Sequence, residues 1–181
     1  MGFDKGAAMT ERSVATEGKL TGIAWLIERV NDIVRAVAQP WLTQFVLRVA
    51  LAVPFWRSGV LKWDGFLQLN PTAVLLFTSE FQLHLPGGPY PYPAPAVMAF
   101  LSGSAEIVFP ILLVLGLFTR LAALGLLVMT IVVELTVPSG WPVHITWAAM
   151  ALALMAWGAG PISLDYLGKR YFGIGATRQA S

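Results

Sequence analysis

The sequence predicts an all-α fold, an integral membrane four-helix bundle preceded by an amphipathic helix at the membrane surface. Of the 181 residues, 56% are hydrophobic and only 12% are charged, and the mean hydropathy is +0.68. Soluble domains carry roughly 25% charged residues, so this composition indicates a protein that crosses a membrane several times. Apolar stretches near the ~20 residues that a bilayer requires supply the helices.

The composition also excludes several kinds of site. The chain contains no cysteine, which rules out disulfides, iron–sulfur clusters and cysteine-based metal sites. The formal net charge of +2 is too small to indicate a nucleic-acid partner. We therefore predict no metal site and no covalently bound cofactor.

The N-terminal part is predicted to lie outside the bilayer core. Residues 1–20 are polar and lack the apolar run of a signal peptide, so we expect a disordered cytoplasmic tail. Residues 21–40 form the next segment, in which a helix over 21–38 is too charged to span and is expected in the membrane surface plane. The apolar residues of this helix have helical spacing and form one face, which comprises Ile23, Leu26, Ile27, Val30, Val34 and Val37. The alternative is a soluble helix packed on the bundle.

Residues 41–167 form the predicted four-helix domain, and residues 168–181 a second cytoplasmic tail. An outer loop over 64–95 follows the first helix. Asn70 and Pro71 have the pattern of a helix start, which predicts a short helix ending at Glu80. The proline-rich run 86–95 predicts an extended strap without regular structure. The spanning helices are expected at about 42–61, 96–115, 117–137 and 143–160.

The distribution of lysine and arginine predicts the orientation. The outer loop from Asp64 to Pro95 and the turn from Pro138 to Pro142 contain neither residue, whereas the N-terminal region and the C-terminal tail contain several. Because basic residues concentrate on the cytoplasmic side, both termini are predicted inside. We expect the inner membrane of a bacterium, with the outer loop facing outwards.

Ionisable residues inside the predicted spans are the candidate catalytic groups: Glu106, Arg57, Glu134 and His144. An ionisable side chain in hydrocarbon is costly unless it is paired or hydrated, so it marks a functional site by default. Helix depth at 1.5 Å per residue predicts that all four converge in the outer half of the bundle. The alternative is a structural ion pair, for which Arg57 is the preferred partner of Glu106 and Arg48 the second choice.

A second set of residues is predicted to contact a ligand. These residues are charged or aromatic, and most lie near the predicted outer boundary or in the outer loop. They are Arg48, Trp56, Lys62, Trp63, Asp64, Glu80, Phe81 and His84.

Three stretches carry a resemblance to a known family: Phe55–Asp64, Ala105–Ala123 and Gly160–Tyr166. The second is the most specific, with a buried acid followed by a leucine-rich run into Gly-x-x-Thr-Arg at residues 116–120. The chain from Leu42 to Tyr166 resembles the DoxX family of small four-helix membrane proteins. Parts of the outer loop also resemble a subgroup found beside copper-responsive, peptide-modifying systems, although His84 and the strap depart from the commoner loop pattern.

The resemblance implies a redox role. One branch of the family is similar to the small subunit of thiosulfate:quinone oxidoreductase, and other members are thought to work with redox or detoxification partners. The first hypothesis is therefore a membrane redox subunit that meets the quinone pool and receives electrons from a partner protein. A transporter or channel for a small solute or proton is the second hypothesis, and a non-catalytic scaffold for a soluble partner is the third. The sequence leaves open whether the chain forms a homo-oligomer.

Overall fold

The computed structural model describes residues 22–172, and its contacts divide the chain into two units, 1–39 and 40–181. In the first unit a helix runs from Gly22 to Val37, within the predicted amphipathic segment. All of its side chains are exposed within the described part of the chain. The tails at 1–20 and 173–181 lie outside the described residues.

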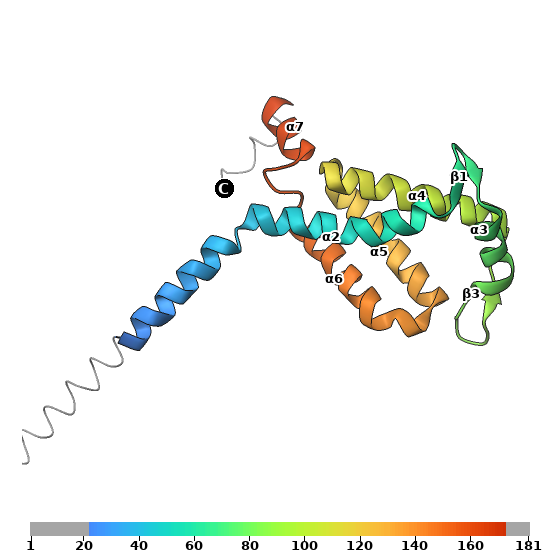
Figure 1. Cartoon of the computed structure of the whole chain (residues 1–181), viewed down its shortest axis with the longest axis horizontal. Helices are drawn as coiled ribbons and strands as arrows, with labels where there is room; N and C mark the ends of the chain where they lie inside the picture. The colour runs from blue at the N-terminus through green and yellow to red at the C-terminus, as the bar shows by residue number, and fades with distance from the viewer. Residues whose placement is uncertain (1–21, 173–181) are drawn as a thin grey trace, which may run out of the picture. The chain divides into compact units, whose positions relative to one another are not determined.

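The second unit is built on four long helices that pack in a closed ring. They are α2 (Pro40–Val60), α4 (Pro95–Leu115), α5 (Thr119–Thr136) and α6 (Trp141–Trp157). α2 packs on α4, α4 on α5, α5 on α6, and α6 again on α2, as Figure 1 shows. The predicted all-α bundle is confirmed, and each helix lies within a few residues of its predicted position.

The helices differ in how well they suit a bilayer. α4 and α5 are long and apolar enough to cross a membrane, and a third span results if the helix Gly22–Val37 and α2 are counted together. α6 has 17 residues, at the lower limit of the range for a span. The chain is a membrane protein, and four crossings remain a prediction.

Apolar side chains fill the centre of the bundle. Leu51, Leu113, Leu126 and Leu154, one from each helix, are completely buried. Many other large apolar side chains lie on the outside of the helices, as expected where lipid surrounds them.

The segment between α2 and α4 folds into short elements at one end of the bundle. Strands β1 (Trp63–Gly65) and β2 (Gln68–Leu69) form a hairpin, followed by α3 (Pro71–Leu75) and the π-helical turn η1 (Leu76–Glu80). The Asn70 side chain accepts a hydrogen bond from the Thr72 N–H, so the predicted helix start is confirmed. The expectation of an irregular strap is wrong in part, because β4 (Tyr90–Pro91) pairs with β3 (Gln82–Leu83).

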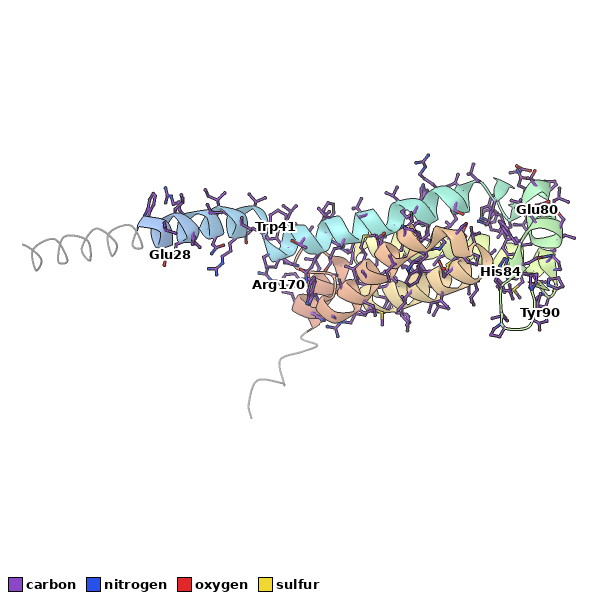
Figure 2. All side chains as sticks on the ribbon, turned by 90° about the horizontal axis from the view of Figure 1, so that it is seen from below. Glu28, Trp41, Glu80, His84, Tyr90 and Arg170 are labelled. Atoms are coloured by element: carbon purple, nitrogen blue, oxygen red, sulfur yellow. The ribbon has the colours of Figure 1, made fainter. Side chains whose placement is uncertain are left out.

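The two ends of the bundle therefore carry different structures. Glu80, His84 and Tyr90 lie at one end, here called the loop end, as Figure 2 shows. Trp41 and Arg170 lie at the opposite end, here called the tail end (Figure 2). The tail end includes α7 (Leu164–Phe172), a helix that the sequence analysis did not predict.

Candidate functional site

A charged pair joins α2 to α4 near the loop end. Lys62 Nζ lies 2.5 Å from Glu106 Oε2, and the Glu106 residue is only 4% exposed. Ser102 donates to Glu106 Oε1 at 3.0 Å, and Lys62 Nζ also donates to Ser58 Oγ at 2.9 Å. Each charge therefore has its opposite charge and a hydroxyl as partners, which offsets the cost of burial.

Close contact between the helix backbones brings these side chains together. A Cβ atom added at Gly59 would lie 2.9 Å from the backbone of Glu106, which is closer than real Cβ contacts. Gly59 thus allows the end of α2 to approach α4, and Lys62 follows three residues later. This is the close packing that small residues permit between membrane helices.

Lys62, and not Arg57, is the partner of Glu106. The predicted pair is wrong, because Arg57 is exposed on the last turn of α2 and forms no hydrogen bond or ion pair within residues 22–172. Lys62 lies just beyond α2 and extends back along the helix to Ser58, four residues earlier. The long, flexible lysine side chain allows this reach.

A cavity of about 520 Å³ adjoins the charged pair. Its walls come from α2, α4, α5, η1 and the segment before α4, and most of the lining is apolar. The lining residues of α4 extend from Met98 to Glu106, which is about 12 Å along the helix at 1.5 Å per residue. The lining residues are Ser58, Lys62, Phe77, Phe81, Tyr92, Met98, Leu101, Ser102, Ala105, Glu106, Val128, Met129, Val132, Val133, Thr136 and Val137.

A pair of hydroxyl groups lies in the lining nearer to the loop end. Tyr92 Oη and Thr136 Oγ1 are 2.5 Å apart. Thr136 donates its own hydrogen to the Val132 carbonyl at 2.7 Å, so Tyr92 is the donor of this bond. The Tyr92 oxygen can then accept a hydrogen bond, and rotation of its hydroxyl would allow it to donate one. The cavity therefore has hydrogen-bonding groups in two places along an otherwise apolar length.

Glu134 and His144 form a second pair, between α5 and α6. His144 Nδ1 lies 2.7 Å from Glu134 Oε2, and His144 is 7% exposed. Its ring also contacts Trp147, at 5.0 Å between ring centroids. Neither Glu134 nor His144 lines the cavity beside Glu106. The four candidate catalytic residues therefore do not form one cluster: Glu106 pairs with Lys62, Glu134 pairs with His144, and Arg57 belongs to neither pair.

The predicted ligand-binding aromatics lie against three different surfaces. Phe81 lines the 520 Å³ cavity. Trp63 and Asp64 line a neighbouring cavity of about 530 Å³ beside the β1–β2 hairpin, where Trp63 Nε1 is buried without a partner. Trp56 lines an apolar groove of about 340 Å³ between α2 and α4, and is 43% exposed.

Among the remaining loop residues, Asp64 and His84 form hydrogen bonds within the protein, whereas Glu80 has no partner among the described residues. Asp64 accepts a hydrogen bond of 2.8 Å from the Asn70 amide. His84 contacts the Leu135 carbonyl through its backbone N–H at 2.7 Å and through Nδ1 at 3.1 Å, which attaches β3 to the end of α5. Glu80 is exposed, and its carboxylate has no partner in the part of the chain that the structure describes.

Arg48 lies at the tail end and bonds to the main chain. It is 1% exposed and donates to the Val114 carbonyl at 3.2 Å and the Ile162 carbonyl at 2.5 Å, with a longer contact to Leu113 at 3.5 Å. The last carbonyls of a helix lack intrahelical donors, and Arg48 supplies them at the end of α4. Arg48 is therefore neither the partner of Glu106 nor part of its cavity.

Asp165 completes the tail end, although the sequence analysis assigned it no role. Its carboxylate accepts hydrogen bonds from the N–H groups of Phe118 at 2.8 Å and Thr119 at 2.9 Å. Thr119 itself does not cap α5, because its hydroxyl is buried without a hydrogen-bond partner among residues 22–172. Gly116 has φ 67° and lies against Arg48 and Ser163, so a side chain there would be both strained and crowded.

The described residues contain no group of three or more histidine, aspartate or glutamate side chains that could hold a metal ion. The Tyr92–Thr136 pair was not predicted, because hydroxyl groups 44 residues apart leave no periodic signal in a sequence. The spacing of Ser58 and Lys62 could have indicated the direction of the lysine, since residues four apart are neighbours on a helix.

Comparison with known proteins supports the resemblance seen in the sequence. The DoxX family model matches residues 43–139, more than half of the chain. An uncharacterized protein of Haemophilus influenzae is 30% identical over 142 residues, which cover 70% of this chain and 83% of the relative. No solved structure matches the chain. The chain belongs to the DoxX family of membrane proteins.

Proposed function

We propose that the chain is a membrane redox subunit whose 520 Å³ cavity binds the head group of a quinone. The observation that carries the proposal is the lining of this cavity, which is apolar apart from a charged pair and a hydroxyl pair. A quinone is a flat, apolar ring with carbonyl oxygens on opposite sides. A site for it needs apolar walls and a hydrogen-bond donor for each carbonyl, and these residues provide both.

Proton transfer is the role proposed for the polar groups. Reduction of a quinone to a quinol consumes two electrons and two protons, and oxidation releases them. Lys62, whose ammonium group has three N–H donors, is the donor beside one carbonyl position, with Glu106 as the group that exchanges a proton. Tyr92 becomes the donor nearer to the loop end when its hydroxyl rotates away from Thr136. The electrons are assigned to a partner oxidoreductase.

Quinone binding is tested on the full-length chain in detergent. A short-chain ubiquinone analogue is titrated while tryptophan fluorescence is recorded, and lipid extracts of the purified protein are analysed for retained quinone. We expect saturable binding that weakens about tenfold in Lys62→Gln and in Tyr92→Phe, since each substitution removes a proposed donor and one good hydrogen bond is worth about 1.5 kcal/mol. Arg57→Gln is the control, because Arg57 does not line the cavity.

Quinone binding, co-purification and proton uptake together separate the three hypotheses. Binding that is absent, or that is unchanged in both cavity variants, rules out the proposed site. A soluble protein that co-purifies without quinone would favour the scaffold. Proton uptake by protein reconstituted in vesicles, in the absence of any quinone, would favour the channel.

The proposed location is the bacterial inner membrane with both ends of the chain in the cytoplasm. The support is the lack of lysine and arginine in the loop from Asp64 to Pro95. Because the chain has no cysteine, single cysteines can report the two sides. The outer membrane of the cells is permeabilised and the inner membrane is left intact. An impermeant reagent should then label Gly88→Cys and should not label Tyr171→Cys. The reverse pattern would invert the topology.

A further inference from the structure

The tail end contains a second polar cavity, of about 570 Å³, that the proposed redox function does not use. The first turn of α5, the turn between α6 and α7, and α7 itself form its walls. The lining residues are Gln44, Phe118, Thr119, Arg120, Leu121, Trp157, Gly158, Ala159, Gly160, Pro161, Ser163, Asp165, Tyr166 and Lys169.

Two cations in this lining have unused hydrogen-bond donors. Arg120 is exposed and, within residues 22–172, makes one hydrogen bond, from Nη2 to the Ala156 carbonyl at 3.3 Å. Lys169 is exposed, and its ammonium group has no partner within residues 22–172. The one carboxylate in the lining belongs to Asp165, and both of its oxygens already accept backbone N–H groups. Both cations therefore have N–H donors available to a ligand, which favours an anion.

Thr119 gives an independent indication of a ligand. Thr119 is one of the lining residues and is 1% exposed, and its buried hydroxyl has no hydrogen-bond partner among residues 22–172. A buried hydroxyl without a partner is uncommon and costs free energy. An oxygen-rich ligand in the cavity would give the hydroxyl an acceptor.

The surroundings of the cavity indicate the kind of molecule that carries the anion. Phe118, Leu121 and Trp157 line the cavity and are 62%, 63% and 64% exposed. Large apolar side chains with this exposure, beside two cations at the end of a membrane bundle, match the boundary between lipid head groups and acyl chains. A molecule with a charged head and apolar chains satisfies both halves of the surface.

We propose that this cavity binds the phosphate group of an anionic phospholipid. Arg120 and Lys169 hold the phosphate oxygens, and Thr119 donates its free hydroxyl to them. The acyl chains follow the apolar surface at Leu121 and Trp157. Basic pockets at the cytoplasmic ends of membrane helices recognise anionic head groups in this way. The proposal is independent of the quinone site, which lies in the cavity beside Glu106.

The test measures lipid binding by the full-length chain in a mild detergent. Phosphatidylglycerol is added, with phosphatidylcholine as the neutral comparison, and native mass spectrometry counts the bound lipid at each concentration. We expect preferential binding of phosphatidylglycerol to the parent. Lys169→Gln should weaken it about fivefold, and Arg120→Gln with Lys169→Gln about 25-fold, from ~1 kcal/mol per basic residue near an anionic lipid.

Arg170→Gln is the matched control. It removes the same charge from the neighbouring residue of α7, and Arg170 does not line the cavity. Equal weakening in Lys169→Gln and Arg170→Gln would overturn the proposal, since it would indicate only a general surface attraction. Equal binding of the two lipids would also overturn it. Inorganic phosphate is the final comparison: if it displaces the lipid at equal concentration, the cavity recognises free phosphate and the lipid assignment is wrong.

Lys169 is exposed and its ammonium group has no partner within residues 22–172, so Lys169→Gln should unfold at the same temperature as the parent without added lipid. Phosphatidylglycerol should raise the unfolding temperature of the parent and of Arg170→Gln more than that of Lys169→Gln. Equal increases in all three proteins would contradict the assigned site.

Discussion

The two ends of the bundle bury charged side chains in opposite ways. At the tail end, Arg48 and Asp165 bond to backbone carbonyl and N–H groups at the ends of α4 and α5. At the loop end, Lys62 and Glu106 bond to each other and to two serine hydroxyls, beside a cavity. The first arrangement completes helix termini, whereas the second leaves titratable groups next to space for a ligand.

This difference shows how a buried charge can be interpreted. Burial does not distinguish the two arrangements, since Arg48 is 1% exposed and Glu106 is 4% exposed. Their partners do distinguish them. Arg48 bonds to backbone carbonyls, whereas Glu106 bonds to side chains beside a cavity.

The largest expected effect is that of Arg48→Met. The substitution removes three contacts from a charged donor to backbone carbonyls, which at ~1.5 kcal/mol each amounts to about 4.5 kcal/mol of unfolding free energy. Thermal unfolding in detergent measures the loss. If the protein unfolds at the parental temperature, the tail-end charges are not structural and the comparison fails.

The second prediction concerns Glu106→Gln, which should cost about 2 kcal/mol, because the amide still accepts hydrogen bonds from Lys62 and Ser102. Combining it with Lys62→Met should recover about 1 kcal/mol, as expected for two residues in direct contact. Denaturant titration of the parent, both single variants and the double variant completes the cycle. Strict additivity would contradict the observed pair.

Asp165→Asn should destabilise the protein by about 1 kcal/mol, the usual value of a side-chain cap at a helix start. The amide oxygen can still accept one of the two backbone N–H groups. The unfolding temperature should therefore fall less than in Arg48→Met, and binding at the loop end should stay at the parental level. A change in quinone binding would mean that the two ends are coupled.

Arg57→Gln is expected to have the smallest effect, within about 0.5 kcal/mol, because its side chain is exposed and has no partner among the described residues. Unfolding temperature and ligand binding should both match those of the parent. A loss of binding with normal stability would restore Arg57 as a functional residue, and would place a site outside the cavity described above.

The sequence predicted the helices well, because apolar length and the prolines and glycines between helices are local signals. The helix start at Asn70 was confirmed for the same reason. Partners were harder to predict. Ideal helix geometry favoured Arg57 for Glu106, but a lysine beyond the helix end reached back instead. Such pairings depend on how closely two backbones approach, which one sequence does not specify.

The tail end shows the same limit. Asp165 and α7 were missed as structural parts, since the residues that the carboxylate bonds, Phe118 and Thr119, lie more than 40 positions away. Of the candidate site residues, Glu106, Lys62 and Phe81 line one cavity, and the others lie elsewhere. The sequence indicated which types of residue are present, but not which of them lie together.

The absence of a side chain at Gly59 has a consequence for motion. Lys62 follows the end of α2 and Glu106 belongs to α4, so any sliding of one helix along the other changes the distance between the two charges. At Gly59 the backbone of α2 lies directly against that of Glu106, with no side chain between them. The distance between the two charges is therefore set by the register of α2 against α4.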